Sequence, residues 1–384
     1  MAGGLLSAGG SSERMSLGRK IGMVSWPIVF LLTMIAGVGV AMLYSGANGS
    51  WEPWAARHMI RFAVALGVML AVAVTDIRLW MRYAYALYFV ALVLLVIVEF
   101  AGIVGMGAQR WINLGFFQLQ PSELMKISLV LALARYFHAL NPEDIGRPLT
   151  LVAPGLLVGV PAVLVLKQPD LGTAMMLIFG GAIMFFVAGV RLWKFAVVIG
   201  IAAAAVPLVW DHLRDYQKKR IWTFLDPESE PLGAGYHILQ SKIALGSGGI
   251  TGKGFLQGTQ SHLNFLPEKQ TDFIFTMLAE ELGLFGGLTL LFLFLLLLAG
   301  GLAIALRIQN HFGRLVAIGI TGTFFLYIFI NIAMVMGLIP VVGVPLPLIS
   351  YGGTAMLSVM FGFGLLMSAN VHRELRIGRY GEGD

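Results

Sequence analysis

Ionisable side chains lie inside, or at the ends of, several long apolar runs of this sequence. Charge is costly in such surroundings, so an ionisable residue there is a functional candidate by default. The candidates are Arg57, Arg61, Glu99, Glu123, Lys126, Asp272, Glu280 and Glu281. The set combines carboxylates that could act as general bases with cations that could bind an anionic lipid diphosphate.

Asp272 stands directly before an apolar run. An Asp in that position is a preferred helix N-cap, and the local sequence alone favours capping. A carboxylate at an apolar boundary with cations nearby can instead be tuned as a general base, and the convergence of the other candidates on the same side of the membrane favours that role. Glu280 would lie ~12 Å deeper in the same helix, where we expect it to hold the helix against its neighbours rather than to react.

Two pairs of candidates share a helix face. Glu123 and Lys126 have i,i+3 spacing, so they form either a self-neutralising salt bridge or part of a water-filled cavity. Arg57 and Arg61 have i,i+4 spacing. They either extend to the headgroups or bind an anionic lipid diphosphate.

Two turn-rich stretches border apolar runs. The sequence Gln168–Thr173 (QPDLGT) predicts a tight outer turn whose Asp170 caps the following helix. The second stretch, Pro340–Gly353, is either a rigid outer turn before a helix that begins at Ser350 or the wall of a cavity. It contains Pro345, Pro347, Ser350 and Gly352.

Several other chemistries are excluded. The sequence has no cysteine, so a disulfide, a thiolate nucleophile or a Cys-ligated metal site is impossible. The glycine-rich run Gly246–Gly254 departs from the register of a phosphate-binding loop and predicts a flexible turn. The seven histidines show no metal-ligand spacing. The net charge is +6, but the Lys and Arg residues are scattered in short groups beside apolar runs, which argues against a nucleic-acid partner.

The elements that position these residues are membrane helices. A hydrophobic content of 58% and a charged content of 12% predict an all-α integral membrane protein. Ten apolar or largely apolar stretches approach the length that crosses ~30 Å of hydrocarbon. They lie at about 22–44, 58–75, 79–98, 122–140, 151–166, 171–190, 195–210, 273–306, 315–339 and 351–370.

Charge asymmetry sets the topology. Arg14, Arg19 and Lys20 precede the first span, and arginines follow the last, so both termini should be cytoplasmic and the number of crossings even. This parity favours counting 122–140 as a span despite its charges. Residues 211–272 then form a large extracytoplasmic loop between helices 7 and 8, and Trp111 lies at interface height in a shorter outer segment.

Several motifs occur along the chain at 107–112 (GAQRWI), 120–126 (QPSELMK), 168–173 (QPDLGT), the stretch from 235–237 (GYH) to 257–260 (QGTQ), 266–283 and 350–353 (SYGG). Together they resemble one known family, the SEDS proteins of bacterial cell-wall synthesis. The resemblance covers nearly all of residues 22–373, and within the family the chain looks most like the elongation (RodA) branch, with the division (FtsW) branch as the alternative.

The resemblance implies a peptidoglycan glycosyltransferase that polymerises lipid II at the outer face of the bacterial cytoplasmic (inner) membrane. Asp272 matches the family's essential aspartate, Glu123 and Lys126 its paired residues on the fourth helix, and Trp111 its sensitive tryptophan. We expect Asp272 to deprotonate the acceptor hydroxyl. Lys126 is expected to lower or position the charge of Asp272. The remaining expected substrate-binding residues are Arg57, Arg61, Arg110, Asp170 and Arg220.

The resemblance also implies partners and boundaries. The expected partners are a class B penicillin-binding protein transpeptidase and elongation-complex proteins. No cofactor is predicted with certainty, although a divalent cation could assist at the diphosphate. The expected units are a cytoplasmic N-terminal tail (1–21), the ten-helix membrane domain (22–371) and a cytoplasmic C-terminal tail (372–384).

Two other classes of function remain as alternatives. A lipid II flippase would explain the spans, the polar cavity and the basic residues, but no pair of broken helices typical of transporters is evident. A non-catalytic scaffold for a transpeptidase is the third class. Labelled lipid II separates the first two, because an enzyme produces polymer ladders and a flippase moves the lipid without forming them.

Overall fold

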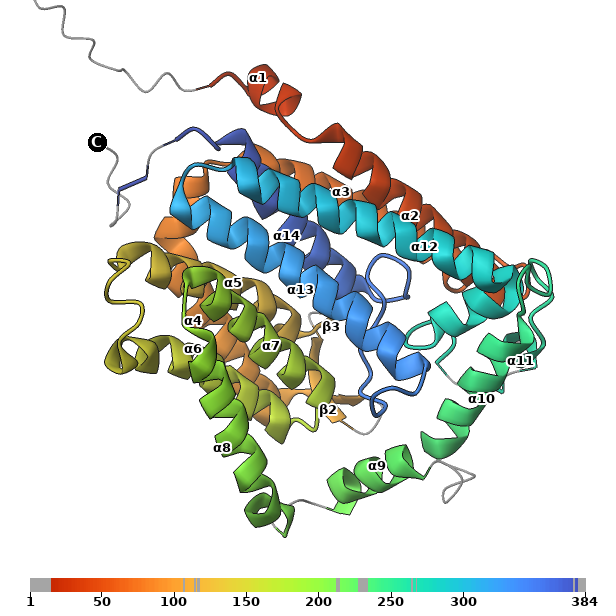
Figure 1. The fold of residues 1–384 in the computed structure, drawn as a ribbon. Coiled ribbons are helices and arrows are strands. Elements are labelled where there is room, and N and C mark those ends of the chain that lie inside the picture. The colour runs from red at the N-terminus through yellow and green to blue at the C-terminus, as the bar shows by residue number, and fades with distance from the viewer. Residues whose placement is uncertain are drawn as a thin grey trace, which may run out of the picture.

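The computed structural model describes residues 15–105, 108–113, 115, 118–211, 215–226, 234–263, 265–266, 268–375 and 377–378. Helices dominate these ranges (Figure 1). The helices are α1 (Leu17–Gly22), α2 (Trp26–Gly46), α3 (Ala55–Val74), α4 (Ile77–Ala101), α5 (Pro121–Ala139), α6 (Pro148–Lys167), α7 (Leu171–Ala188), α8 (Leu192–Trp210), α9 (Asp215–Leu225), α10 (Ala234–Ser247), α11 (Thr259–His262), α12 (Ile274–Arg307), α13 (His311–Val335) and α14 (Gly353–Val371). Three short strands follow α4, namely β1 (Ile103–Gly105), β2 (Ala108–Asn113) and β3 (Gln118–Leu119).

Eight of these helices are long and apolar enough to cross a membrane: α2, α3, α4, α6, α7, α12, α13 and α14. Helix α8 is apolar over Leu192–Leu208. Helix α5 coincides with the predicted fourth span and carries Glu123, Lys126 and Arg135. The fold class is therefore confirmed as multi-spanning and helical, whereas the count of ten crossings stays a prediction.

The burial of α5 explains how it tolerates charge. Most of its residues are buried, because α4, α6, α7, α13 and α14 all pack against it. A helix shielded from lipid by other helices can hold ionisable groups that the hydrocarbon would not accept. The lower hydropathy of α5 compared with the other long helices therefore reflects its position inside the bundle.

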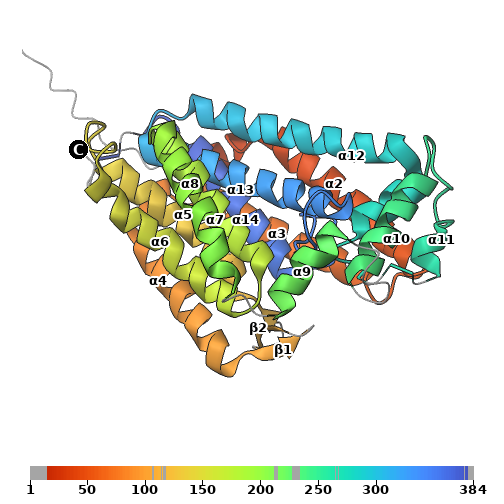
Figure 2. The same ribbon diagram turned by 60° about the horizontal axis from the view of Figure 1, so that its bottom comes forward.

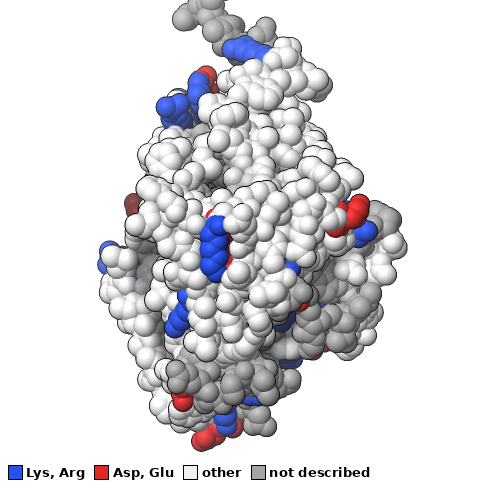
Figure 3. All heavy atoms as spheres, turned by 90° about the vertical axis from the view of Figure 1, so that its right-hand side faces the viewer, with Lys and Arg blue, Asp and Glu red and all other residues white. Residues whose placement is uncertain are grey.

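The two ends of the helix bundle differ in character. Helix α1 and the last turn of α14 lie at one end, whereas the strands, α10 and α11 lie at the other (Figures 1 and 2). We name the second the outer end, following the predicted topology. Helices α9, α10 and α11 belong to the predicted loop 211–272. Figure 3 shows the side that lies at the right of Figure 1, where the charged side chains are scattered over a mostly uncharged surface.

The outer segment after α4 forms a small antiparallel sheet with the order β1-β2-β3. Ile103 faces Trp111 across the first pair of strands, and Ile112 faces Leu119 across the second. The prediction of an all-α chain missed this sheet. Strand β3 runs almost directly into α5, which begins at Pro121, so the sheet is anchored beside the first turn of that helix.

Helix α12 is broken at Gly283, whose φ of 66° and ψ of −162° are not helical. Backbone from the glycine-rich run fills the break. The amides of Leu284 and Phe285 donate to the carbonyls of Gly249 and Ile250, at 3.0 and 3.2 Å. The run 246–254 therefore satisfies the backbone of a broken helix, as membrane-depth irregularities require.

Candidate active site

A polar cavity of about 170 Å³ lies at the outer end of the bundle. Its walls come from β2, α5, α7, the residues just before α12 and the segment that leads into α14. We name it the polar cavity. Its lining residues are Arg110, Trp111, Gln120, Glu123, Lys126, Thr173, Met176, Thr271, Asp272, Gly343, Val344, Pro345, Tyr351, Gly352, Thr354 and Ala355.

Glu123 and Lys126 form a buried ion pair in this wall, with 2.7 Å between Lys126 Nζ and Glu123 Oε1. The other carboxylate oxygen of Glu123 accepts a hydrogen bond from the hydroxyl of Tyr327 on α13. Lys126 Nζ also lies 4.2 Å from the centre of the Tyr327 ring. The pair is therefore a salt bridge, and both of its side chains also line the cavity.

Asp272 is half-buried and faces the same cavity. Helix α12 has Phe273 at its N-cap position and no side-chain capping bond, so the capping interpretation of Asp272 is wrong. Burial, together with the negative charges of Glu268 and Asp170, raises the pKa of Asp272 to about 7, while Arg110 acts in the opposite direction. A carboxyl with this pKa exchanges protons readily near neutral pH, as a general base must.

Arg110, which lines the polar cavity, contacts Asp170, which is buried and is not among the lining residues. Arg110 donates a 2.7 Å hydrogen bond to the carbonyl of Pro169, and its Nε lies 3.7 Å from Asp170 Oδ2. Asp170 also accepts a 3.1 Å hydrogen bond from the Thr173 amide, so it caps α7 as the sequence predicted. Two contacts, to Pro169 and to Asp170, therefore fix the position of the Arg110 side chain in the cavity wall.

The other predicted arginines are less directly placed. The guanidinium of Arg61 lies 4.5 Å from the centre of the Tyr351 ring, next to the cavity lining. Arg57 is exposed and lies 3.6 Å from Glu52, away from that lining. Arg220 falls in α9, but its side chain lies outside the described part of the chain.

The segment before α14 forms a cavity wall, which was one of the two alternatives for 340–353. Gly343, Pro345 and Gly352 line the polar cavity, and Pro347 is buried. Helix α14 begins at Gly353 with Gly352 at its N-cap, so the expectation that Ser350 begins this helix is wrong.

Glu280 and Glu281 lie away from the polar cavity, fully buried in the outer part of α12. Glu280 pairs with Lys253 at 2.7 Å, and Glu281 accepts hydrogen bonds from Ser45 at 2.6 and 2.8 Å. These contacts attach the loop after α10, and the end of α2, to α12.

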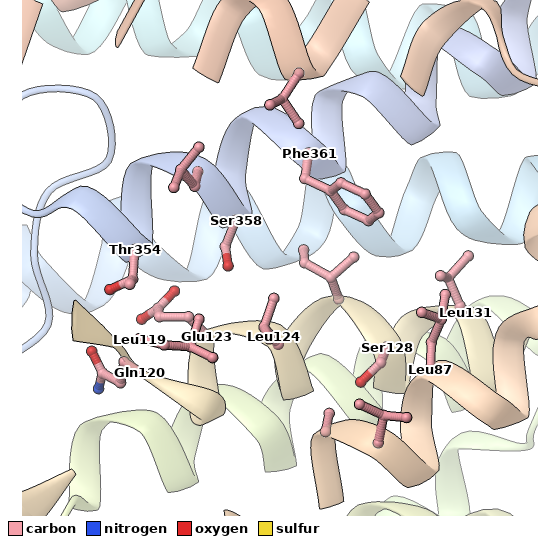
Figure 4. A pocket seen from close by; sticks show the side chains of 15 residues that line it. Leu87, Leu119, Gln120, Glu123, Leu124, Ser128, Leu131, Thr354, Ser358 and Phe361 are labelled. Atoms are coloured by element: carbon pink, nitrogen blue, oxygen red, sulfur yellow. The ribbon is translucent and has the colours of Figure 1, made fainter. Parts of the chain in front are cut away.

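An apolar groove of about 310 Å³ adjoins the polar cavity. Val68, Val90 and Leu124 in its walls are among the exposed hydrophobic residues, so the groove is open toward the lipid-facing side. In Figure 4 the polar side chains Gln120, Glu123 and Thr354 gather at one end, and leucines and Phe361 continue away from them. Those three polar residues belong to both spaces. The two spaces are therefore neighbours with a shared wall, one holding most of the charged side chains and the other lined chiefly by apolar ones.

Sequence reasoning missed several members of the site. Tyr327 lies in an apolar, aromatic-rich run, FFLYIFINIA, and nothing in a single sequence separates it from a core aromatic residue. The pairing of Gln120 with Glu123 and Thr354 at the end of the groove depends on the packing of α5 against α14. Within the described residues, no group of three or more His, Asp or Glu side chains could hold a metal ion.

The chain matches a family model described as "Cell cycle protein", FTSW_RODA_SPOVE, over residues 20–375. This chain belongs to that family. It is 45% identical over 353 residues to the peptidoglycan glycosyltransferase MrdB of Escherichia coli K12, an alignment that covers 91% of this chain and 94% of MrdB. It is 32% identical to the peptidoglycan glycosyltransferase RodA of Treponema pallidum, with 92% of this chain and 99% of that protein covered.

Solved structures of the FtsW/RodA/SpoVE family agree with this fold. A chain from a peptidoglycan synthase complex that coordinates polymerization and crosslinking matches with a TM-score of 0.76 and 34% identity, covering 91% of this chain and 98% of that one. RodA of Thermus thermophilus matches with a TM-score of 0.67 and 30% identity, covering 92% and 98%. Together with its apolar helices, these relatives make the chain a multi-pass protein of the inner membrane.

Proposed function

We propose that this protein is a peptidoglycan glycosyltransferase that polymerises lipid II into glycan strands during cell elongation, with Asp272 as the general base. The observation that carries the proposal is that the polar cavity, with Asp272 in its wall, lies next to the apolar groove and shares Gln120, Glu123 and Thr354 with it. A lipid-linked sugar has the same division into a polar head and an apolar tail. The names of the relatives, peptidoglycan glycosyltransferases, support the same substrate class.

In the proposed reaction, the 4-hydroxyl of the acceptor sugar attacks the anomeric carbon of the donor. Asp272 takes the hydroxyl proton as the new carbon–oxygen bond forms, and the bond to the lipid diphosphate breaks. Lys126 and Arg110 lie in the cavity wall, where their charge offsets the negative charge that develops on the diphosphate. The guanidinium of Arg61 lies over the ring of Tyr351, and Trp111 lines the cavity together with Arg110.

The proposed enzyme has a catalytic membrane domain, flanking tails and protein partners. We assign residues 22–371 to the catalytic membrane domain, with the flanking segments 1–21 and 372–384 as cytoplasmic tails. The partners are a class B penicillin-binding protein and other elongation proteins. The synthase complex among the similar structures supports a partner that crosslinks. A divalent cation would have to bind chiefly through the substrate diphosphate, since the described side chains offer no cluster for it.

The decisive experiment replaces Asp272 with Asn in purified protein and follows labelled lipid II, alone and with the cognate transpeptidase. Loss of polymer ladders with an unchanged thermal midpoint supports Asp272 as the base. Polymer formation at the wild-type rate by Asp272→Asn would refute that role. Wild-type protein that moves lipid II across vesicles without forming polymer would instead establish the flippase alternative.

A further inference from the structure

The backbone around Asp272 is held by donors from the last third of the chain. Three consecutive carbonyls take part. Gln270 O accepts from the Tyr351 amide at 2.8 Å, Thr271 O accepts from Ser350 Oγ at 2.6 Å, and Asp272 O accepts from Asn331 Nδ2 at 2.9 Å. We name this set the carbonyl clamp.

Asn331 joins Asp272 to the opposite wall of the polar cavity. Its amide nitrogen donates a second hydrogen bond, of 2.7 Å, to the carbonyl of Val344, which lines the cavity. Both neighbours are acceptors, and the two N–H bonds of the neutral amide NH₂ group serve both of them. Asn331 is fully buried on α13. One side chain therefore fixes the distance between Asp272 and the 343–345 wall.

Ser350 connects the same two segments at a second point. Besides donating to Thr271 O, its hydroxyl accepts a 2.8 Å hydrogen bond from the Leu346 amide. The hydroxyl thus bridges the residue before Asp272 and the turn behind Pro345. This use of Ser350 differs from the helix start that one of the two alternatives for 340–353 gave it.

The carboxylate of Asp272 receives no hydrogen bond from any described residue, so its orientation depends on its backbone. Gly343, with φ of 71°, faces it so closely that a Cβ there would lie 3.3 Å from Asp272 Oδ2. A base that is free of hydrogen bonds keeps its lone pairs for the substrate. It then needs a rigid main chain to keep it within reach of the acceptor hydroxyl.

We infer that Asn331 and Ser350 are positioning residues, which hold the Asp272 carboxylate in the polar cavity through the carbonyls of Thr271 and Asp272. The inference rests on the proposed function, because it takes Asp272 as the base. It differs from a general packing role in one respect. Loss of the clamp lowers the rate of the chemical step and leaves substrate binding largely unchanged, whereas loss of packing alone affects stability and not the chemical step.

The test compares Asn331→Ala and Ser350→Ala with two matched controls at the cytoplasmic end. Asn370 donates to the Met23 carbonyl at 3.0 Å, and Ser368 donates to the Thr75 carbonyl at 2.7 Å. Asn370→Ala and Ser368→Ala therefore remove the same groups from the same kind of bond, far from the cavity. All four variants are purified at full length and measured for kcat, KM with lipid II and thermal midpoint. Amide hydrogen exchange over 268–277 is also measured.

Loss of the clamp should lower kcat on the order of 10- to 100-fold, the cost of a small misplacement of a reacting group. KM should stay within about twofold, exchange over 268–277 should rise, and both controls should match wild type. Ser350→Thr keeps the hydroxyl and should retain most of the wild-type rate. Ser350→Val has the shape of the Thr variant but no hydroxyl, so it should be as slow as Ser350→Ala.

Three outcomes would overturn the inference: unchanged kcat in Asn331→Ala and Ser350→Ala, unchanged exchange over 268–277, or equal losses in the controls. Asp272→Asn, measured beside them, separates a failure of the positioning role from a failure of Asp272 as the base. If Asp272→Asn is inactive and the clamp variants are fully active, only the positioning role fails. If Asp272→Asn is active, the proposed base itself fails.

Discussion

Removing the charge of Lys126 tests whether the buried ion pair serves catalysis or only the fold. The side chains of Lys126 and Glu123 are each 3% exposed, and their charged atoms are 2.7 Å apart. Removing one partner of such a pair leaves an uncompensated buried charge, which costs about 3–5 kcal/mol. We therefore expect Lys126→Met to lower the free energy of unfolding by that amount.

The double variant Glu123→Gln, Lys126→Met separates the two roles. It removes both charges and keeps side-chain volume, so it should recover most of the lost stability. The Tyr327 hydroxyl still finds an acceptor in the Gln carbonyl. Polymer formation should remain about 10²–10³-fold below wild type in both variants, because the cation that stabilises the developing diphosphate charge is absent from each.

Unfolding is followed by titration with SDS in mixed micelles, and activity by the ladder formed from labelled lipid II. Arg147→Met is the control. Arg147 and Asp144 have the same i,i+3 spacing at 2.9 Å, but their side chains are 70% and 27% exposed, so the loss there should be below about 1 kcal/mol. A double variant that regained wild-type polymerisation would show that the pair is only structural. A fully stable Lys126→Met variant would refute the argument from burial.

Three further predictions concern the same region. With its pKa at about 7, Asp272 is deprotonated in about a tenth of molecules at pH 6 and about nine tenths at pH 8, so initial polymerisation rates should fall as pH falls through 7. A flat profile from pH 5.5 to 8.5, an interval of about three units around that pKa, would contradict this. Gly252→Ala should lower the thermal midpoint, because Gly252 has φ of 83° and a Cβ there would lie 2.1 Å from the Glu281 carbonyl oxygen. Gly246→Ala, with nothing within 4 Å, is the control, and equal midpoints would count against the packing argument. Leu124→Trp should fill the apolar groove and raise KM for lipid II at an unchanged midpoint, and an unaltered KM would remove the groove from the substrate path.

The parts of the site that sequence reasoning predicted are local. The i,i+3 spacing of Glu123 and Lys126 holds on any helix, so their ion pair could be predicted from the sequence. Asp170 caps α7 because both ends of that contact lie within one turn. The membrane helices followed from length and hydropathy alone, although the charged α5 required an argument from parity.

The parts that were missed depend on contacts between distant segments. Asn331 and Asp272 are 59 residues apart, and Ser350 and Thr271 are 79 apart. The sequence around Asp272 resembles a helix start, and only the position of α13 shows that its backbone is used otherwise. The small sheet around Trp111 was missed because its strands have only three, six and two residues, too few to show an alternating pattern.

The carbonyl clamp also has a consequence for biosynthesis. Residues 270–272 leave the ribosome before Asn331, Ser350 and Tyr351, which supply all three donors. A nascent chain that ends before α13 therefore lacks every donor of the clamp. If the clamp positions Asp272 as inferred, such a chain should be at least as impaired as the clamp variants, by about 10- to 100-fold in rate. The proposed activity should then reach its full rate only when α13 and the segment before α14 have been inserted.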